Sequence, residues 1–292
     1  MLAGHKLALG TAQLGQRYGI TNQSGPPDGG EIQTMLEVLR SAGCDTLDTA
    51  MSYGDSEDVL GAAGVRDFKI ITKLPPLPSD SDTTQQWVRE SVHRSLQRLR
   101  VARLHGLLLH RPSDASGAHA PALLGALAAL KAEGLVANVG VSVYGPDELA
   151  TLQGVMKLDI VQAPYNVLDR RFAASGWFGR LRAAGTEVHV RSVFLQGLLL
   201  LEPARLPDTH SLWRPLWQRW SDWIGSRGLD RLAAALGFVL QNPDITRVVI
   251  GAETAAQLRQ IVASAVVLKQ EVPAELATDD LNLINPVNWT KK

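Results

Sequence analysis

Short apolar runs alternate along the whole chain with segments in which apolar residues recur every three or four positions. Apolar runs of four to eight residues are typical of buried strands, and the longer period is typical of amphipathic helices. Their alternation predicts βα units around a parallel sheet. Eight strands are predicted, at Lys6–Ala12, Thr46–Ala50, Lys69–Leu74, Leu104–His110, Val136–Val143, Asp159–Tyr165, Glu187–Phe194 and Arg247–Ala252. Eight helices are predicted, at Glu31–Ser41, Ser56–Ala63, Thr83–Arg100, Pro121–Ala132, Pro146–Leu152, Trp177–Ala184, Leu229–Gln241 and Ala255–Ser264.

The length of 292 residues suits one large domain, because eight-stranded α/β barrels run to about 250 residues or more in a single unit. No short repeat and no serine- or proline-rich linker divides the chain. We therefore expect an α/β fold, a (β/α)8 TIM barrel forming a single domain over residues 1–292. An inserted segment at about 203–228 and a C-terminal tail from about 265 extend this plan.

The inserted segment is rich in tryptophan. Its residues Trp213, Leu216, Trp217, Trp220, Trp223 and Ile224 fall at spacings of three and four, so they would share one face of a helix. Two interpretations are open: the face packs against the barrel, or it lines a pocket for a ring-shaped substrate such as a sugar.

Composition narrows the possible partners. The 29 basic and 29 acidic residues balance, whereas nucleic-acid binding calls for a basic face. The most apolar stretch, 193–201, is far shorter than the ~20 residues that span a bilayer. The first residues do not resemble a secretion signal, which predicts a cytoplasmic protein without nucleic-acid or membrane partners. The single cysteine, Cys44, excludes an internal disulfide, and without an H-E-x-x-H motif no metal site is expected.

Four polar side chains lie at or just beyond the ends of three predicted strands: Asp48, Tyr53, Lys73 and His110. Each has an ordinary explanation taken singly, as a helix cap, a loop aromatic, a solvated strand end or a turn residue. In a parallel barrel, however, the carboxyl ends of the strands meet at one rim, where barrel enzymes carry their active sites. An acid, a phenol, an ammonium and an imidazole would then converge, which favours a catalytic site over four coincidences.

In their order and approximate spacing, these four residues resemble the aspartate, tyrosine, lysine and histidine tetrad of the aldo-keto reductase superfamily. The resemblance implies reduction of an aldehyde or ketone, or oxidation of the matching alcohol, which are small-molecule substrates. No protein side chain donates hydride, so this reaction requires a nicotinamide cofactor, NAD(P)H. A phenol has an ordinary pKa of about 10, and a neighbouring ammonium favours its ionised form. Tyr53 would therefore be the proton donor, supported by Lys73.

The remaining roles follow from the same chemistry. Asp48 would fix Lys73 by ion pairing, and His110 would donate a hydrogen bond to the substrate oxygen and orient it.

Later strand ends resemble the cofactor-binding segments of the same superfamily. The matching residues are Ser142, Gln162, Arg191, Ser192, Gln196, Gly197, Gly251, Glu253, Thr254, Gln257 and Gln260. The chain departs from the family pattern at two places. Val143 replaces the usual asparagine that contacts the carboxamide, and Arg191 replaces the tyrosine that commonly stacks on the nicotinamide, although a guanidinium can also stack on a flat ring.

Glu253 bears on the choice between the two cofactors. It would repel the 2′-phosphate of NADPH and accept a hydrogen bond from the free 2′-hydroxyl of NADH. Arg259 and Thr254 could instead favour the phosphate. We expect NADH to bind at least as well as NADPH.

Other classes of protein are disfavoured by their motifs. The chain has no G-x-G-x-x-G, no P-loop and no G-x-S-x-G. A Schiff-base role for Lys73 is disfavoured because the ammonium would stay protonated beside Asp48. One alternative stays open, a nicotinamide-binding regulatory or sensing protein on the same fold, as in the resembling potassium-channel beta subunits.

Overall fold

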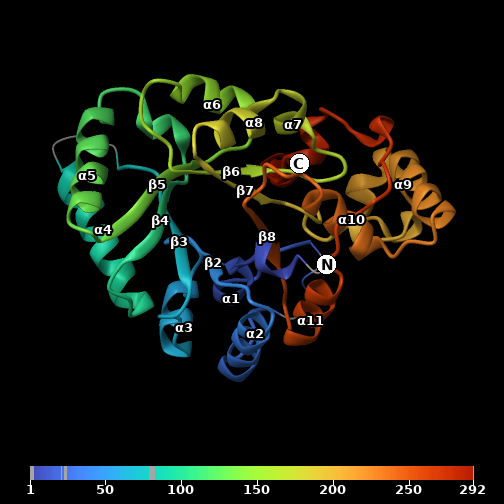
Figure 1. Cartoon of the computed structure of the whole chain (residues 1–292), viewed down its shortest axis with the longest axis horizontal. Coiled ribbons are helices and arrows are strands. Elements are labelled where there is room, and N and C mark those ends of the chain that lie inside the picture. Colours follow the sequence, from blue (N-terminus) through green and yellow to red (C-terminus); the bar gives the residue numbers. More distant parts are fainter. Residues whose placement is uncertain (1–2, 21, 23–24, 79–82, 292) are drawn as a thin grey trace.

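The computed structural model describes residues 3–20, 22, 25–78 and 83–291. Its centre is a closed barrel of eight parallel strands in sequential order, β1 to β8 (Figure 1). The strands are β1 (Leu7–Gly10), β2 (Thr46–Asp48), β3 (Lys69–Leu74), β4 (Leu104–Leu109), β5 (Val136–Ser142), β6 (Ile160–Pro164), β7 (Glu187–Arg191) and β8 (Arg247–Gly251). The predicted TIM-barrel fold is therefore confirmed.

Helices surround the barrel and cover its outer face (Figure 1). They are α1 (Ala12–Gly15), α2 (Gly29–Ser41), α3 (Ser56–Ala63), α4 (Thr84–Leu99), α5 (Ala120–Ala132), α6 (Pro146–Leu152), α7 (Arg171–Ala174), α8 (Trp177–Ala183), α9 (Arg214–Ser226), α10 (Arg231–Leu240), α11 (Ala255–Ala263) and α12 (Leu281–Ile284). Among the described residues no helix is long and apolar enough to cross a membrane.

Side-chain caps mark where several helices begin. The carboxylates of Asp28 and Asp230 accept hydrogen bonds from the backbone N–H groups at the starts of α2 and α10, and the hydroxyl of Thr254 does the same for α11. Each cap satisfies a donor that the helix cannot pair internally. Predicted helix bounds therefore agree with the structure to within two residues for these three elements.

The barrel interior is filled by side chains, with Ile71, Leu108 and Ile160 forming a small apolar cluster on its inner face. The larger apolar core lies between the outer faces of the strands and the helices. Because both faces of the strands are buried, their sequences read as continuous apolar runs. This explains why the strands were recognisable.

Every predicted strand except Lys69–Leu74 extended one to three residues too far at its carboxyl end. The prediction Glu187–Phe194 was wrong beyond Arg191, because Ser192, Leu195 and Gln196 have φ angles of 60°, 47° and 52° and so leave the extended conformation. The prediction Thr46–Ala50 was wrong beyond Asp48, where the ladder with β1 ends.

The amino-terminal strand was also overextended. Lys6 belongs to a short 3-10 helix at Gly4–Lys6, and Ala12 begins α1 rather than ending β1.

The inserted segment holds two short 3-10 helices and α9. The buried indoles of Trp217 and Trp220 donate hydrogen bonds to the carbonyls of Leu198 and Leu199, over 2.9 and 3.1 Å. Those carbonyls belong to the connection after β7, hereafter the β7 loop (residues 192–200). The tryptophan face thus packs on the β7 loop, in line with the first of the two sequence interpretations.

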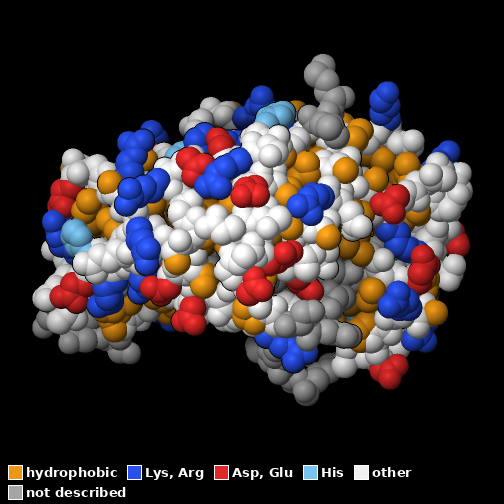
Figure 2. All heavy atoms as spheres, turned by 90° about the horizontal axis from the view of Figure 1, so that it is seen from below, with side chains coloured by type: hydrophobic (Ala, Val, Ile, Leu, Met, Phe, Trp, Pro, Cys, Tyr) orange, Lys and Arg blue, Asp and Glu red, His pale blue; other side chains and the backbone are white. Residues whose placement is uncertain are grey.

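The C-terminal tail docks on the same inserted segment. The indole of Trp213 donates to Asp280 over 2.9 Å, and the ring of Trp289 meets that of His210 edge to face at 4.9 Å. On the face shown in Figure 2, basic and acidic side chains are interspersed, as the balanced composition predicts.

Candidate active site

Lys73 anchors the group of polar side chains at the carboxyl end of the barrel. Its ammonium donates to Asp48 Oδ1 over 2.6 Å and to the carbonyl of Thr49 over 2.8 Å. Both members of the ion pair are buried, with 1% of Lys73 and 3% of Asp48 exposed. Burial lowers the pKa of Lys73, but the negative charge of Asp48 and the hydrogen bond to it help to hold that pKa above its ordinary value. Lys73 is therefore a cation, which argues against Schiff-base chemistry.

Tyr53 and His110 lie over this ion pair. The Lys73 ammonium is 5.2 Å from the centroid of the Tyr53 ring, and the rings of Tyr53 and His110 meet edge to face at 6.0 Å. The structure thus brings together the four residues that the sequence singled out. Their side chains come from β2, from β3, and from the turns that follow β2 and β4.

His110 is held neutral. Burial is the main cause that lowers its pKa to about 4, and the positive charges of Lys73 and Arg191 lower it further. Its Nδ1 lies 3.4 Å from the hydroxyl of Ser52. At neutral pH the imidazole carries one N–H, so it can donate a hydrogen bond without acting as a competing acid.

The connection between β2 and α3, hereafter the Tyr53 loop (residues 49–55), is held in place by close contacts with α1. A Cβ atom on Gly15 would lie 2.0 Å from the carbonyl oxygen of Tyr53, and one on Gly54, whose φ is 54°, would lie 2.3 Å from the carbonyl oxygen of Gly15. Only glycine permits this approach at both positions. The hydroxyl of Ser56 adds a hydrogen bond to the carbonyl of Thr11 over 3.0 Å.

Gly15→Ala is expected to displace the Tyr53 loop and to destabilise the fold by ~1–3 kcal/mol, the usual cost of overpacking. Turnover should fall with it. Urea unfolding and steady-state kinetics measure both effects. Gly29→Ala is the control, because a Cβ at that position, at the start of α2, meets nothing within 4 Å. A Gly15→Ala protein as active and stable as the Gly29→Ala protein would contradict this assignment.

Helix α3, which follows the Tyr53 loop, is fixed by a buried carboxylate. Glu57 is 2% exposed and accepts hydrogen bonds from the hydroxyls of Thr72 and Ser95, each over 2.7 Å, and from Arg98 Nε over 2.9 Å. These bonds tie α3 to β3 and α4. A buried charge with several donors is satisfied, so it supports a rigid site.

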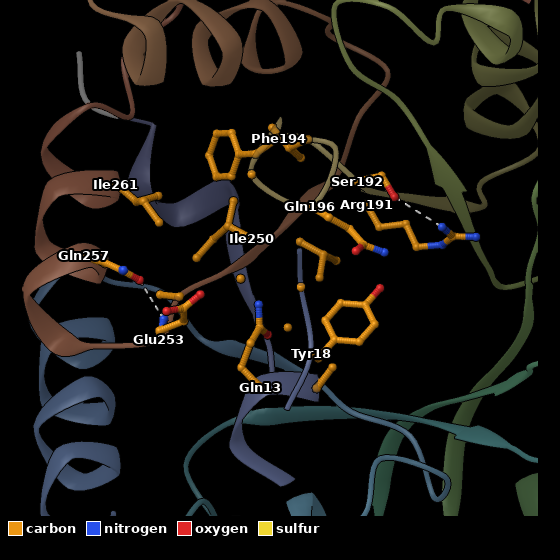
Figure 3. A pocket seen from close by; sticks show the side chains of 18 of the residues that line it. Gln13, Tyr18, Arg191, Ser192, Phe194, Gln196, Ile250, Glu253, Gln257 and Ile261 are labelled. Carbon is orange, nitrogen blue, oxygen red and sulfur yellow. Dashed lines mark hydrogen bonds between the residues drawn. The ribbon is translucent and has the colours of Figure 1, made fainter. Parts of the chain in front are cut away.

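A cavity of about 400 Å³ has both Tyr53 and residues from the start of α11 in its wall. Figure 3 shows it from close by, with Glu253 and Gln257 at one side and Arg191 at the other. The predicted site residues that line it are Asp48, Tyr53, Gln162, Arg191, Ser192, Gln196, Gly197, Gly251, Glu253, Gln257 and Gln260. Lys73, His110, Ser142 and Thr254 are not part of the wall. Ser142 lies behind it and donates to Gln162 Oε1 over 3.4 Å, and Thr254 caps α11.

Gln162 joins the two halves of this site. Its side-chain amide donates to Asp48 Oδ2 over 2.6 Å and is completely buried. Asp48 therefore holds Lys73 with one oxygen and Gln162 with the other. One carboxylate thus links the predicted catalytic lysine to the predicted carboxamide contact.

The residues present fit a dinucleotide. The cavity wall carries polar side chains from several strand ends, and the β7 loop forms part of it. Residues at the amino terminus of α11, where backbone N–H groups favour anions, also belong to the wall. The positive φ angles in the β7 loop turn its backbone, a conformation that non-glycine residues seldom adopt and that clusters at binding sites.

Sequence reasoning missed several wall residues, chiefly Gln13 and Tyr18 from the connection after β1, and Phe194 from the β7 loop (Figure 3). The signal available for Gln13 and Tyr18 was their position after the first strand, where barrel loops approach the site.

Barrel and site together define a class of protein, the (β/α)8 barrels with ionisable side chains gathered at the carboxyl ends of their strands. Comparison with known proteins gives the family. The model of the aldo/keto reductase family matches residues 6–278, so the chain belongs to that family and is an oxidoreductase.

Among its relatives is a D-threo-aldose 1-dehydrogenase from a Pseudomonas species, 31% identical over 94% of this chain and 92% of the relative. An NADH-specific methylglyoxal reductase from Escherichia coli is 26% identical over 80% and 82% of the two chains. An aldo-keto reductase from Bacillus halodurans, solved in its holo form, shares the fold with a TM-score of 0.71 at 21% identity, covering 90% and 88% of the chains. The family uses NAD(P)H to interconvert carbonyl and alcohol groups.

Proposed function

We propose that this protein reduces a sugar-derived aldehyde or ketone to the corresponding alcohol, with Tyr53 as the proton donor. The observation that carries the proposal is the buried Lys73–Asp48 pair beneath Tyr53 and His110 at one end of a long cavity. The similarity to an aldose dehydrogenase over 94% of the chain supports a sugar-derived substrate.

The chain's own residues have distinct parts in this reaction. When bound, NAD(P)H supplies the hydride to the carbonyl carbon. Neutral His110 donates a hydrogen bond to the carbonyl oxygen and orients it, and Tyr53 delivers the proton to that oxygen. Lys73 stabilises the phenolate left behind, because a cation near an ionising phenol favours the charged form. Asp48 keeps the ammonium in place.

The lining of the cavity supports a proposal for how the cofactor is held. Gln162, with Ser142 behind it, would contact the carboxamide, and Ser192, Gln196 and Gly197 of the β7 loop would contact the pyrophosphate. The residues proposed for the adenosine end are Gly251, Glu253, Thr254, Gln257 and Gln260.

The test is reduction of an aldehyde panel that includes short sugars, followed through oxidation of NADH and NADPH, with the alcohol product identified by mass. We expect one alcohol formed for each cofactor consumed. A protein that binds cofactor but reduces none of the panel would contradict the proposal and would favour a sensing role.

Cofactor choice gives a separate prediction. Glu253 belongs to the cavity wall, just before the start of α11 (Figure 3). Its backbone N–H donates a hydrogen bond to Gln257 Oε1 over 2.8 Å. We propose that NADH binds at least as well as NADPH, because Glu253 would repel a 2′-phosphate. Glu253→Ser should shift the ratio of the two Kd values about tenfold toward NADPH, equivalent to ~1.4 kcal/mol.

Fluorescence titration with both cofactors measures this ratio. Glu253→Gln is the matched control that removes the charge and keeps the size, so it should produce most of the shift. A clear NADPH preference in the unmodified protein would show that Glu253 does not act on the ribose.

A further inference from the structure

Arg191, the last residue of β7, is held rigidly at the Tyr53 end of the cavity. Its Nη2 donates to the carbonyl of Val143 over 3.0 Å and its Nη1 to the hydroxyl of Ser192 over 3.3 Å. The carbon of its guanidinium lies 4.3 Å from the centroid of the Tyr144 ring. Figure 3 shows the side chain at the edge of the cavity, near Tyr18. A guanidinium stacked on an aromatic face is well fixed.

The positive charge of Arg191 has no acidic partner in the part of the chain that the structure describes. Among the described residues, no carboxylate oxygen lies within the 4.0 Å that defines an ion pair with its guanidinium. Its neighbour Arg171, by contrast, is paired with Asp169 over 2.8 Å. The carboxylate of Asp48 is already engaged by Lys73 and Gln162. Around His110, the two cations Lys73 and Arg191 therefore face one anion, Asp48.

The positive charge of Arg191 acts on His110, one of the four predicted catalytic residues. Besides burial and Lys73, Arg191 is a cause of the lowered pKa of His110. The guanidinium also has N–H donors to spare, because it carries five and uses two in the bonds above. A half-buried guanidinium is planar, and its free N–H groups can donate two parallel hydrogen bonds, so it is suited to bind a carboxylate or a phosphate.

We propose that Arg191 selects substrates that carry an anionic oxygen group, a carboxylate or a phosphate, in addition to the carbonyl. Acidic sugars and phosphorylated sugars have this chemistry. The inference rests on the proposed carbonyl reduction, since it names the class of substrate for the same site. It also gives a reason for an arginine at the position where related proteins commonly carry a tyrosine.

The test compares matched pairs of aldehydes at saturating cofactor. Benzaldehyde is paired with 4-carboxybenzaldehyde, and D-glyceraldehyde with its 3-phosphate, so the two pairs separate carboxylate from phosphate. For at least one pair, we expect kcat/KM of the unmodified protein to favour the anionic member by ~10- to 100-fold, the range for a hydrogen-bonded charge pair. The preference should weaken as ionic strength rises.

Arg191→Gln should bring the ratio of kcat/KM between the anionic and the neutral aldehyde close to one. Arg191→Lys keeps the charge but not the planar guanidinium, so it should retain part of the preference. Because both members of a pair are measured with the same protein and cofactor, any change in cofactor affinity cancels. Arg219→Gln on the exposed face of α9 is the charge-matched control and should leave the ratio unchanged. A ratio in Arg191→Gln equal to that of the unmodified protein, or no anionic preference in either pair, overturns the inference.

A binding measurement separates this inference from the proposed reaction. If no aldehyde is reduced, carbonyl reduction fails, and calorimetric titration with 4-(hydroxymethyl)benzoate and benzyl alcohol replaces kinetics. Tighter binding of the acid that is lost in Arg191→Gln then supports the anion site on its own. Equal binding of the two alcohols by the unmodified protein contradicts it.

Discussion

Tyr53→Phe is expected to lower kcat for carbonyl reduction at least about 100-fold, the usual cost of losing a general acid. The substitution removes only a hydroxyl. The ring keeps its contacts with His110 at 6.0 Å and with Lys73 at 5.2 Å, so the loop and the cofactor affinity should be preserved. Steady-state kinetics and fluorescence titration of the cofactor measure the two quantities.

Tyr165→Phe is the control for loss of a phenol hydroxyl. Tyr165 is buried between Phe178 and Phe238, away from the cavity wall. It should keep near-normal turnover. Near-normal turnover in Tyr53→Phe as well would refute the assignment of the proton donor.

Lys73→Met should damage both stability and rate. It leaves the carboxylate of Asp48, 3% exposed, without its cation, and breaking one partner from a buried pair typically costs about 3–5 kcal/mol. The rate should fall ~100-fold or more, because the charge that stabilises the developing phenolate is gone. Urea unfolding and steady-state kinetics give the two numbers.

The matched control lies four residues earlier on the same strand. Lys69 pairs with Asp45 over 2.8 Å, but both side chains are nearly half exposed, so Lys69→Met should cost no more than ~1 kcal/mol. Adding Asp48→Asn to Lys73→Met should recover part of the lost stability, because it removes the unpaired charge. A double variant whose loss equals the sum of the two single losses would show that the pair does not interact.

The sequence predicted the barrel well because burial on both faces of each strand leaves short apolar runs, as in Leu107 to Leu109 of β4. Strand ends were predicted less well where the backbone changes direction without a glycine. The residue types at Ser192, Leu195 and Gln196 do not indicate a positive φ angle, because serine, leucine and glutamine seldom adopt one.

For the site, the residues at strand ends were predictable because topology alone brings those ends together. Loop residues such as Tyr18 were missed, since their position depends on the path of a long connection. The tryptophan spacing predicted a helical face in α9, but not that Trp217 would bond the carbonyl of Leu198 in the β7 loop, a contact between segments 19 residues apart.

The central claim is that this barrel transfers hydride to a carbonyl carbon beside Tyr53. Its most direct test uses NADH carrying deuterium at the transferred position, mixed with the protein and a reducible aldehyde, with the alcohol product analysed by mass spectrometry and NMR. We predict one deuterium on the carbinol carbon of the product, formed by the unmodified protein and at least ~100-fold more slowly by Tyr53→Phe. An alcohol without deuterium, or labelled alcohol formed equally fast by Tyr53→Phe, would contradict the account.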